Sequence, residues 1–188
     1  GKVTVDETLP ESARIRVLFR KLDDKAAANL KGLKRIASLT IEDASGLTDR
    51  GLAAIGTLTS LHELSLFDPS ITNTGVASLK GLKELHKLYV MDAGKVSDAG
   101  VAALKGLDKL EELDLSGSAI TSGAGATFKT LTALKLLAVS KTKFGDAGVA
   151  QLKELKELKK LEAVAADVSE KAAKGLEAAV KGVQVVRR

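Results

Sequence analysis

Two histidines and a glutamate recur at one position of the chain and have the residue types of a metal site. His62, His86 and Glu111 follow one another at the spacing of an internal repeat. Two imidazoles and one carboxylate form a ligand set that transition metals use. A repeat array, however, copies residues to equivalent places without any chemical reason, and no residue that would orient the imidazoles is evident. We expect no metal ion here, and these three residues are the candidates for one.

Catalytic arrangements are missing from the sequence. It contains no cysteine, no nucleophile elbow and no phosphate-binding loop. Gly123-Ala124-Gly125 falls in a segment that we expect to be helical and lacks the surrounding pattern of a dinucleotide site. Neither histidine has a serine placed as a triad partner. We expect a protein that is not an enzyme and holds no cofactor.

Large apolar residues and acids share positions that we expect to face solvent. Phe67, Tyr89 and Met91 lie at outward positions of short predicted strands, and large apolar side chains on a sheet's solvent face are typical of a binding site. Acidic residues surround them: Glu42, Asp43, Asp68, Asp92 and Asp114. This composition predicts a protein or peptide partner that carries basic residues, since complementary charge steers association and gives specificity.

Other interpretations of these residues stay open. The apolar side chains can be covered by the N-terminal leader or the C-terminal loop, or pack only on one another. Surfaces with aromatic residues and aspartates also bind sugars, so binding of a carbohydrate or cell-envelope ligand is the alternative function. A structural spacer within a longer protein is the third hypothesis.

The aspartates have an interpretation of their own. Asp43, Asp68 and Asp92 are expected on consecutive strands, with backbones about 4.8 Å apart. Like charges at that spacing repel, which favours a bound cation or a Lys or Arg from a partner. Alternatively, the carboxylates splay into water or accept hydrogen bonds from turn amides.

The elements that position these residues come from a repeat of 24 or 25 residues. Each copy reads L-x-x-L-x-x-L-x-L, then five or six residues, then an apolar residue with Thr, Ser or Gly after it, and a second half close to x-x-G-x-A-x-L. In the clearest copies, this first half spans residues 58–72, 82–97, 107–121 and 131–145. This period and leucine spacing are the signature of leucine-rich repeats, with one short strand and one helix in each unit.

Alternation within the strand halves predicts which side chains face inward. The inward pairs are Ile15/Val17, Leu39/Ile41, Leu64/Leu66, Leu88/Val90, Leu113/Leu115, Leu137/Val139 and Leu161/Ala163. The first of these pairs places Arg16 level with Thr40 on the outward side. A last strand is expected around Val183 and Val185.

The fold class that follows is α/β, a right-handed leucine-rich repeat solenoid in a short horseshoe arc. About eight parallel strands form its concave face and short helices its convex face, because helices are wider than the spacing of strands. Residues 1–12 form a leader that is expected to add an edge strand through Val3 and Val5. Residues 13–188 form one solenoid, in which each strand and helix unit is called a rung. A degenerate cap rung is expected at 13–31, regular repeats at about 32–177 and a cap strand at about 182–187.

Hydroxyl residues and glycines mark the helical halves. A Ser or Thr opens the helices and is expected to cap their free N–H groups: Thr48, Thr72, Ser97, Thr121 and Ser169. Glycines inside the helical segments weaken them, so close packing is the expected compensation. These glycines are Gly51, Gly75, Gly100 and Gly148.

Bulk composition restricts the partners. The formal charge is +5, but the lysines are scattered over helix ends and connections, and the aromatic residues lie among acids, so we expect no nucleic acid. No apolar run approaches the roughly 18 residues of a membrane span. We expect a monomer. The chain begins at Gly1 without an initiator Met, which suggests a processed or trimmed form, and its compartment stays undecided.

The run 96–107, Val-Ser-Asp-Ala-Gly-Val-Ala-Ala-Leu-Lys-Gly-Leu, resembles bacterial T-D-x-G-L-x-x-L-x-x-L repeats. Over residues 13–186 the chain is similar to GALA-type and ribonuclease-inhibitor-like leucine-rich repeats, which are common in planctomycete proteins. The resemblance implies protein binding without naming a target. The chain lacks the asparagine that such repeats usually have in the turn after each strand. The backbone carbonyl groups of that turn must therefore find hydrogen-bond partners other than a ladder of asparagines.

Overall fold

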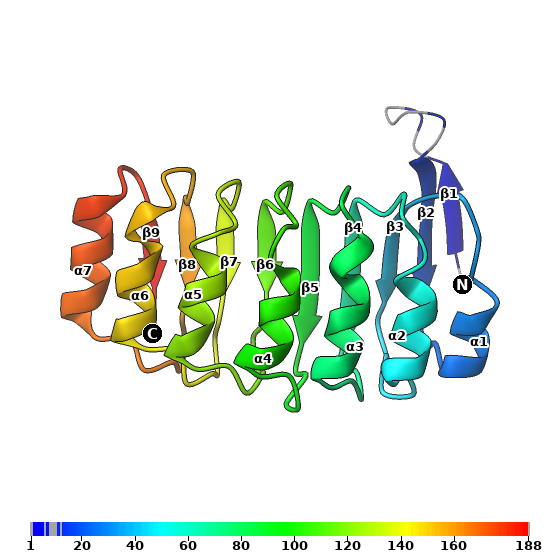
Figure 1. The fold of residues 1–188 in the computed structure, drawn as a ribbon, viewed down its shortest axis with the longest axis horizontal. Helices are drawn as coiled ribbons and strands as arrows, with labels where there is room; N and C mark the ends of the chain where they lie inside the picture. Colours follow the sequence, from blue (N-terminus) through cyan, green and yellow to red (C-terminus); the bar gives the residue numbers. More distant parts are fainter. Residues whose placement is uncertain (1, 6, 8–10, 12, 188) are drawn as a thin grey trace.

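The strands of the protein line up in chain order to form one sheet, and the helices lie along one side of it (Figure 1). The structure is a computed structural model that describes residues 2–5, 7, 11 and 13–187. The sheet has nine strands in the order β1 to β9. β1 pairs antiparallel with β2, and every later pair is parallel. The face turned away from the helices, predicted as the concave one, is called the open face below.

The strands are short, as the alternating segments predict. They are β1 Lys2–Val5, β2 Ala13–Phe19, β3 Arg35–Ile41, β4 Glu63–Phe67, β5 Lys87–Met91, β6 Glu112–Asp114, β7 Leu136–Ala138, β8 Lys160–Glu162 and β9 Gln184–Val186.

The helices are short too, and several end in a 3-10 turn. The α-helices are α1 Asp24–Ala28, α2 Asp49–Ile55, α3 Asn73–Ala77, α4 Asp98–Val101, α5 Gly125–Phe128, α6 Asp146–Gln151 and α7 Glu170–Ala179. The 3-10 segments are η1 Ser78–Gly81, η2 Ala102–Leu104, η3 Ser122–Ala124 and η4 Leu152–Glu154. From β2 to β8, the helix that follows each strand supplies the parallel crossover to the next strand, which a two-residue hairpin cannot make.

The core is a continuous apolar layer between the sheet and the helices. In one rung, Leu58, Leu61, Leu64 and Leu66 are all completely buried, and the same pattern recurs along the array. Leucine predominates because each rung must present the same shape to both neighbours. The core therefore extends along the stack, and its stability is close to a sum of rungs and of the interfaces between them.

The first rung differs from the sequence-based alignment by two residues. Val17 pairs with Leu39 and Phe19 with Ile41, so Leu18, rather than Arg16, is level with Thr40. Irregular pairing between Ala13 and Arg16 shifts the register. The prediction of Ile15/Val17 as the equivalent of Leu39/Ile41 was therefore wrong: a bulge changes the count of residues on one strand without changing the alternation that sequence reasoning follows.

A ladder of hydrogen bonds joins the helix N-termini of successive rungs. Asp49 accepts a hydrogen bond from the backbone N–H of Thr72 at 2.7 Å and another from the Thr72 hydroxyl at 2.6 Å. Equivalent contacts form what we call the cross-rung ladder: Asp24 with Thr48, Asn73 with Ser97, Asp98 with Thr121, and Asp146 with Ser169. The Thr and Ser residues thus receive a fixed orientation from the rung before them.

The cross-rung ladder explains the glycines inside the helices. A Cβ built on Gly75 would lie 2.4 Å from Asp49 Oδ1, and one on Gly51 would lie 2.4 Å from Asp24 Oδ1. At Gly100 the obstacle is Asn73 Oδ1, at 2.6 Å. The close packing expected at these positions is therefore that of a neighbouring rung's acceptor against bare backbone. Gly148 packs differently, against the ring of Phe144 in its own rung.

Candidate functional site

Two adjacent strands in the middle of the sheet bring together the apolar residues singled out in the sequence. Phe67 ends β4 and is level with Met91, which ends β5. Tyr89 lies two residues before Met91, on the same face, and is level with Ser65. Phe67 is 37% exposed, whereas Tyr89 and Met91 are half-buried. These three residues form an apolar patch on the open face.

The Tyr89 side chain is held in place by a charged network. Its hydroxyl donates a hydrogen bond to Glu112 Oε2, and Lys87 Nζ lies 2.8 Å from Glu112 Oε1. Burial and the hydrogen bond to Glu112 raise the pKa of Tyr89 above its usual value. Burial also raises the pKa of Glu112, but Lys87 and Tyr89 outweigh it and leave that pKa lowered. These contacts hold the Tyr89 ring in one orientation.

A row of charged residues lies beside the apolar patch on the open face, and the sequence analysis did not identify it. Glu63 and Lys87 are level with one another, and Lys87 is level with Glu112. Arg16 extends the row, with its Nη1 3.3 Å from Glu63 Oε2. Extending the outward alternation by two residues toward the start of each strand would have found Glu63, Lys87 and Glu112. Because these charges pair with one another, they frame the apolar patch without adding much net charge.

The predicted acidic residues lie at the ends of β3 to β6 or directly after them and are called the acidic rim: Glu42, Asp43, Asp68, Asp92 and Asp114. Asp114 is level with Tyr89 and accepts a hydrogen bond from the backbone N–H of Ser116 at 2.8 Å. Asp43 accepts bonds from the hydroxyl and the N–H of Ser45, and its Oδ2 lies 3.0 Å from Lys21 Nζ. These bonds, first among them that from the Ser45 hydroxyl, lower the pKa of Asp43 to about 2.

Asp68 and Asp92 occupy a special backbone position. Their φ angles are 52° and 57°, in the left-handed region, and the equivalent residue of the next rung is Gly117 with φ 73°. Among non-glycine residues, Asp and Asn adopt this conformation most readily. The equivalent residues of later rungs, Lys141 and Ala165, also have φ angles of 55°, so turn geometry permits an aspartate at these two positions without requiring one. Both aspartate side chains are exposed.

The histidines stack as the repeat alignment suggests. The ring centroids of His62 and His86 are 5.3 Å apart, with an angle of 21° between the planes. His86 Nδ1 contacts the Glu84 carbonyl oxygen at 2.7 Å, while His62 Nδ1 is buried without a hydrogen-bond partner. Glu111 pairs instead with Lys135 at 2.8 Å. Within the described part of the chain, no group of three His, Asp or Glu side chains is arranged to hold a metal ion.

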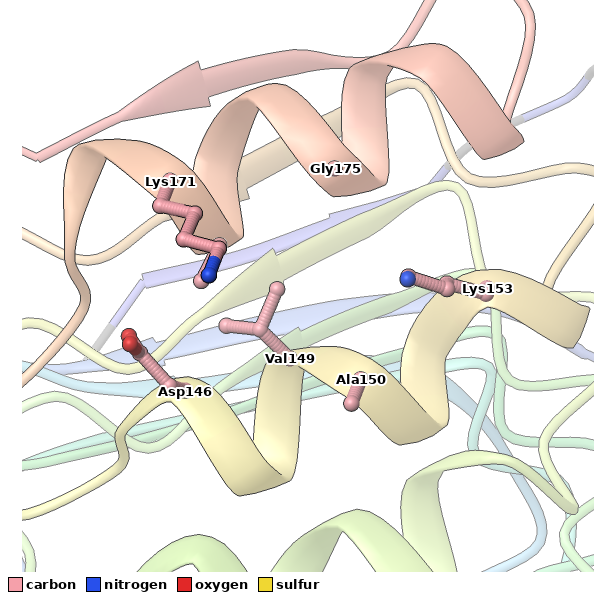
Figure 2. A pocket seen from close by; sticks show the side chains of 7 residues that line it. Asp146, Val149, Ala150, Lys153, Lys171 and Gly175 are labelled. Carbon is pink, nitrogen blue, oxygen red and sulfur yellow. The ribbon is translucent and has the colours of Figure 1, made fainter.

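A groove lies on the helical side of the sheet, away from the apolar patch. It lies between α6 and α7 and has a volume of about 460 Å³. Figure 2 shows the side chains that line it. Its lining residues are Asp146, Val149, Ala150, Lys153, Lys171, Ala172 and Gly175. No residue predicted from the sequence to bind a partner lies in it. In residues 2–5, 7, 11 and 13–187 no helix is long and apolar enough to cross a lipid bilayer.

The repeated strand and helix units, the parallel sheet and the leucine core define the fold as an α/β leucine-rich repeat solenoid. Solved structures agree. The chain is similar to internalin C2 from Listeria monocytogenes, with a TM-score of 0.69 and 22% identity, over 91% of this chain and 68% of that one. It is also similar to an internalin, inlF, from the same species, with a TM-score of 0.52 and 18% identity.

The second of these similarities covers 88% of this chain and 50% of the internalin. At such identities the likeness concerns the fold. No protein-family model matches the chain, and a search of curated proteins finds no match either. The GALA-type and ribonuclease-inhibitor-like subtype expected from the sequence stays a prediction.

Proposed function

We propose that the protein is a non-catalytic binding module whose open face holds a protein or peptide segment that carries basic residues. The observation that supports this most is the apolar patch. Phe67 exposes 37% of its surface in the middle of a sheet, next to Met91 and Tyr89. Large apolar side chains at the centre of a polar surface are the usual anchors of protein interfaces.

The charges around the patch favour a basic partner. Acidic residues outnumber basic ones in residues 36–128, whereas both ends of the chain are basic. Glu42, Asp68 and Asp92 are exposed, and none of the three has an ion pair within the described residues. Lys87 and Arg16, two cations of the open face, are already paired with Glu112 and Glu63. The unpaired charges beside the patch are thus acidic, and we expect them to attract a Lys or Arg of the partner.

The fixed Tyr89 ring supports a role in binding. A side chain that is already ordered loses little conformational entropy when a partner covers it, whereas a free side chain loses about 0.5 to 1.5 kcal/mol. Aromatic residues also carry much of the energy in measured interfaces. Phe67 and Tyr89 are thus the residues that we expect to dominate the affinity.

The experiment is a screen of immobilised peptides and proteins beside a glycan array, followed by affinity measurements on the best ligand. The double variant F67A/Y89A should lower the affinity at least tenfold, because it removes about 1.5 to 3 kcal/mol of apolar burial for each residue that a partner covers. Leu33→Ala is the matched control. Leu33 is 47% exposed but lies in the connection between α1 and β3, away from the patch.

Charge gives a second readout. D68N/D92N should slow association and weaken its dependence on salt while leaving dissociation nearly unchanged, as expected for steering. Equal affinity of F67A/Y89A and the unmodified protein would refute the assignment of the apolar patch as the binding site. Binding to glycans without any protein or peptide ligand would favour the carbohydrate hypothesis, and a lack of ligands in both screens would favour the spacer.

A further inference from the structure

An outward row of side chains connects the N-terminal edge of the sheet with the apolar patch. β1 is the edge strand, and all four of its residues are exposed, Val3 and Val5 included (Figure 1). Strand pairing places one residue of each strand from β1 to β6 in this row: Lys2, Leu18, Thr40, Ser65, Tyr89 and Asp114. The row thus begins with a lysine and ends with an aspartate of the acidic rim, and Tyr89 of the apolar patch lies between them.

A hollow of about 300 Å³ lies over the first strands of this row. The residues that line it include Lys2, Thr4, Arg16, Leu18, Thr40 and Glu63. The carboxylate of Glu63 is already engaged, since it pairs with Arg16 at 3.3 Å and accepts a hydrogen bond from the Ser38 hydroxyl at 3.1 Å. Lys2 has no ion pair within residues 2–5, 7, 11 and 13–187, so its ammonium group is left for an acid of a partner.

A second hollow, of about 560 Å³, adjoins the first one, because Lys2 and Leu18 line both. Its other lining residues are Arg20 and Lys21, which directly follow β2. Lys21 pairs with Asp43 at 3.0 Å, whereas Arg20 has no ion pair in the part of the chain that the structure describes. The two hollows together, called the basic hollow below, thus hold two cations, Lys2 and Arg20, that no carboxylate of the described residues compensates.

The open face therefore differs in charge from one side to the other. The basic hollow lies over β1 and β2, whereas the exposed acids Glu42, Asp68 and Asp92 follow β3, β4 and β5, beside the apolar patch. A partner whose charges were all basic would be repelled at the basic hollow. A partner with acidic residues on that side and basic residues on the other is complementary to the whole face.

We propose that the segment bound on the open face crosses the strands in extended form, with Asp or Glu side chains in the basic hollow and apolar residues on Phe67 and Tyr89. Its basic residues then lie along the acidic rim. The inference rests on the proposed function and adds to it the acidic end of the partner. Acidic side chains fit better than a chain terminus, because a terminus supplies one carboxylate and the basic hollow has two uncompensated cations.

The spacing of the strands sets the spacing of these residues in the partner. Strands are about 4.8 Å apart, and an extended chain advances about 3.3 Å per residue. Tyr89 lies three strands beyond Leu18 and four beyond Lys2, which corresponds to about 14 to 19 Å. The acidic residues should therefore be separated from the apolar ones by about four to six positions.

Selection from a library of peptides of about 12 residues, long enough to span β1 to β6, tests the proposal. Both peptide ends are blocked, so that only side chains carry charge. The unmodified protein should enrich peptides with Asp or Glu about four to six positions from an apolar residue and with Lys or Arg on its other side. K2E/R20E should remove the preference for acids without loss of folded structure, because both side chains are exposed. K31E/K34E makes the same change of charge in the connection between α1 and β3 and should keep that preference.

Affinity measurements on one enriched peptide locate its acidic residues. K2E/R20E should weaken binding of this peptide about fivefold or more, since two exposed ion pairs are replaced by like charges. When Gln replaces the acidic residues of the peptide, most of the difference between K2E/R20E and the unmodified protein should disappear, as a double-mutant cycle requires of groups in contact.

The outcomes separate this inference from the proposed function. Enrichment of apolar and basic peptides without a preference for acids would overturn the inference and leave the proposed function standing. A preference for acids that persists in K2E/R20E, or an equal loss of affinity for the Gln peptide, would also overturn it, because the carboxylates would then lie elsewhere. If the library yields no ligand at all, the proposed function fails and this inference fails with it.

Discussion

Replacing Gly75 with alanine should destabilise the protein, although this change stabilises an ordinary helix. Alanine is favoured over glycine in a helix interior by about 0.5 to 1 kcal/mol. At this position, however, the new Cβ would lie 2.4 Å from Asp49 Oδ1 and 3.3 Å from Asp49 Cα. The first distance is far shorter than any real contact of a Cβ atom. The Asp49 carboxylate must therefore leave the place from which it binds Thr72.

The size of the expected loss of stability follows from two hydrogen bonds of Asp49. The N–H and the hydroxyl of Thr72 donate to Asp49 at 2.7 and 2.6 Å, and a bond to a charged group contributes about 1.5 to 3 kcal/mol. Asp49 and Thr72 are half-buried, so water replaces part of the loss and the lower value applies. The two bonds together are worth about 3 kcal/mol. After the helical gain of Ala is subtracted, Gly75→Ala should lower the free energy of unfolding by about 2 kcal/mol.

Urea unfolding followed by far-UV circular dichroism measures this difference. Gly81→Ala is the control, since a Cβ there meets nothing within 4 Å and should leave the stability unchanged or slightly raised. In an Asp49→Ala background the carboxylate is absent and only the 3.3 Å approach to the Cα of residue 49 remains, so Gly75→Ala should destabilise much less than in the unmodified protein. A stabilising effect of Gly75→Ala in the unmodified protein would refute this reasoning. An effect of equal size with and without the carboxylate would refute it too.

Two further predictions concern ionisation. The Ser45 hydroxyl, Lys21 and the Ser45 N–H together lower the pKa of Asp43 to about 2. The contribution of Asp43 to stability is therefore complete above the pKa of the unfolded chain and is lost as pH falls from about 4 toward 2. Asp43→Asn should flatten the decline of the unfolding free energy in that window, and an unchanged slope would contradict the assignment. Burial and Glu112 raise the pKa of Tyr89, the single tyrosine, so an ultraviolet titration should show phenolate forming above the pH typical of a free tyrosine. Glu112→Gln should move that transition to lower pH, and a titration at the ordinary value in the unmodified protein would count against the network.

The repeat pattern predicted most of the fold, because each regular position has one simple physical role. Leucines at fixed spacing are buried, and alternation decides which strand residues face outward. The parallel strands β2 to β9 and the helices between them follow from these two patterns. The same alternation placed Phe67, Tyr89 and Met91 on one face, where the structure finds them.

Contacts between rungs were beyond the reach of such reasoning. The sequence marked Thr72 as a cap and Gly75 as a close-packed residue, but only the structure shows that Asp49, from the preceding rung, is the partner of both. The ionic row of Glu63, Lys87 and Glu112 also depends on lateral neighbours that are about 24 residues apart in sequence. Local patterns do not encode which side chain reaches across a strand pair.

The sequence by itself determined the class of fold, the direction in which each strand residue points and the residues of the apolar patch. The tertiary structure alone decided the register of β2, the cross-rung ladder and the exposure of the Val3 and Val5 edge. The physical reason is that burial periodicity is a local property of the chain, repeated in every rung. Register, hydrogen-bond partners and uncovered edges depend instead on what lies beside each rung, and this differs most at the ends of the array.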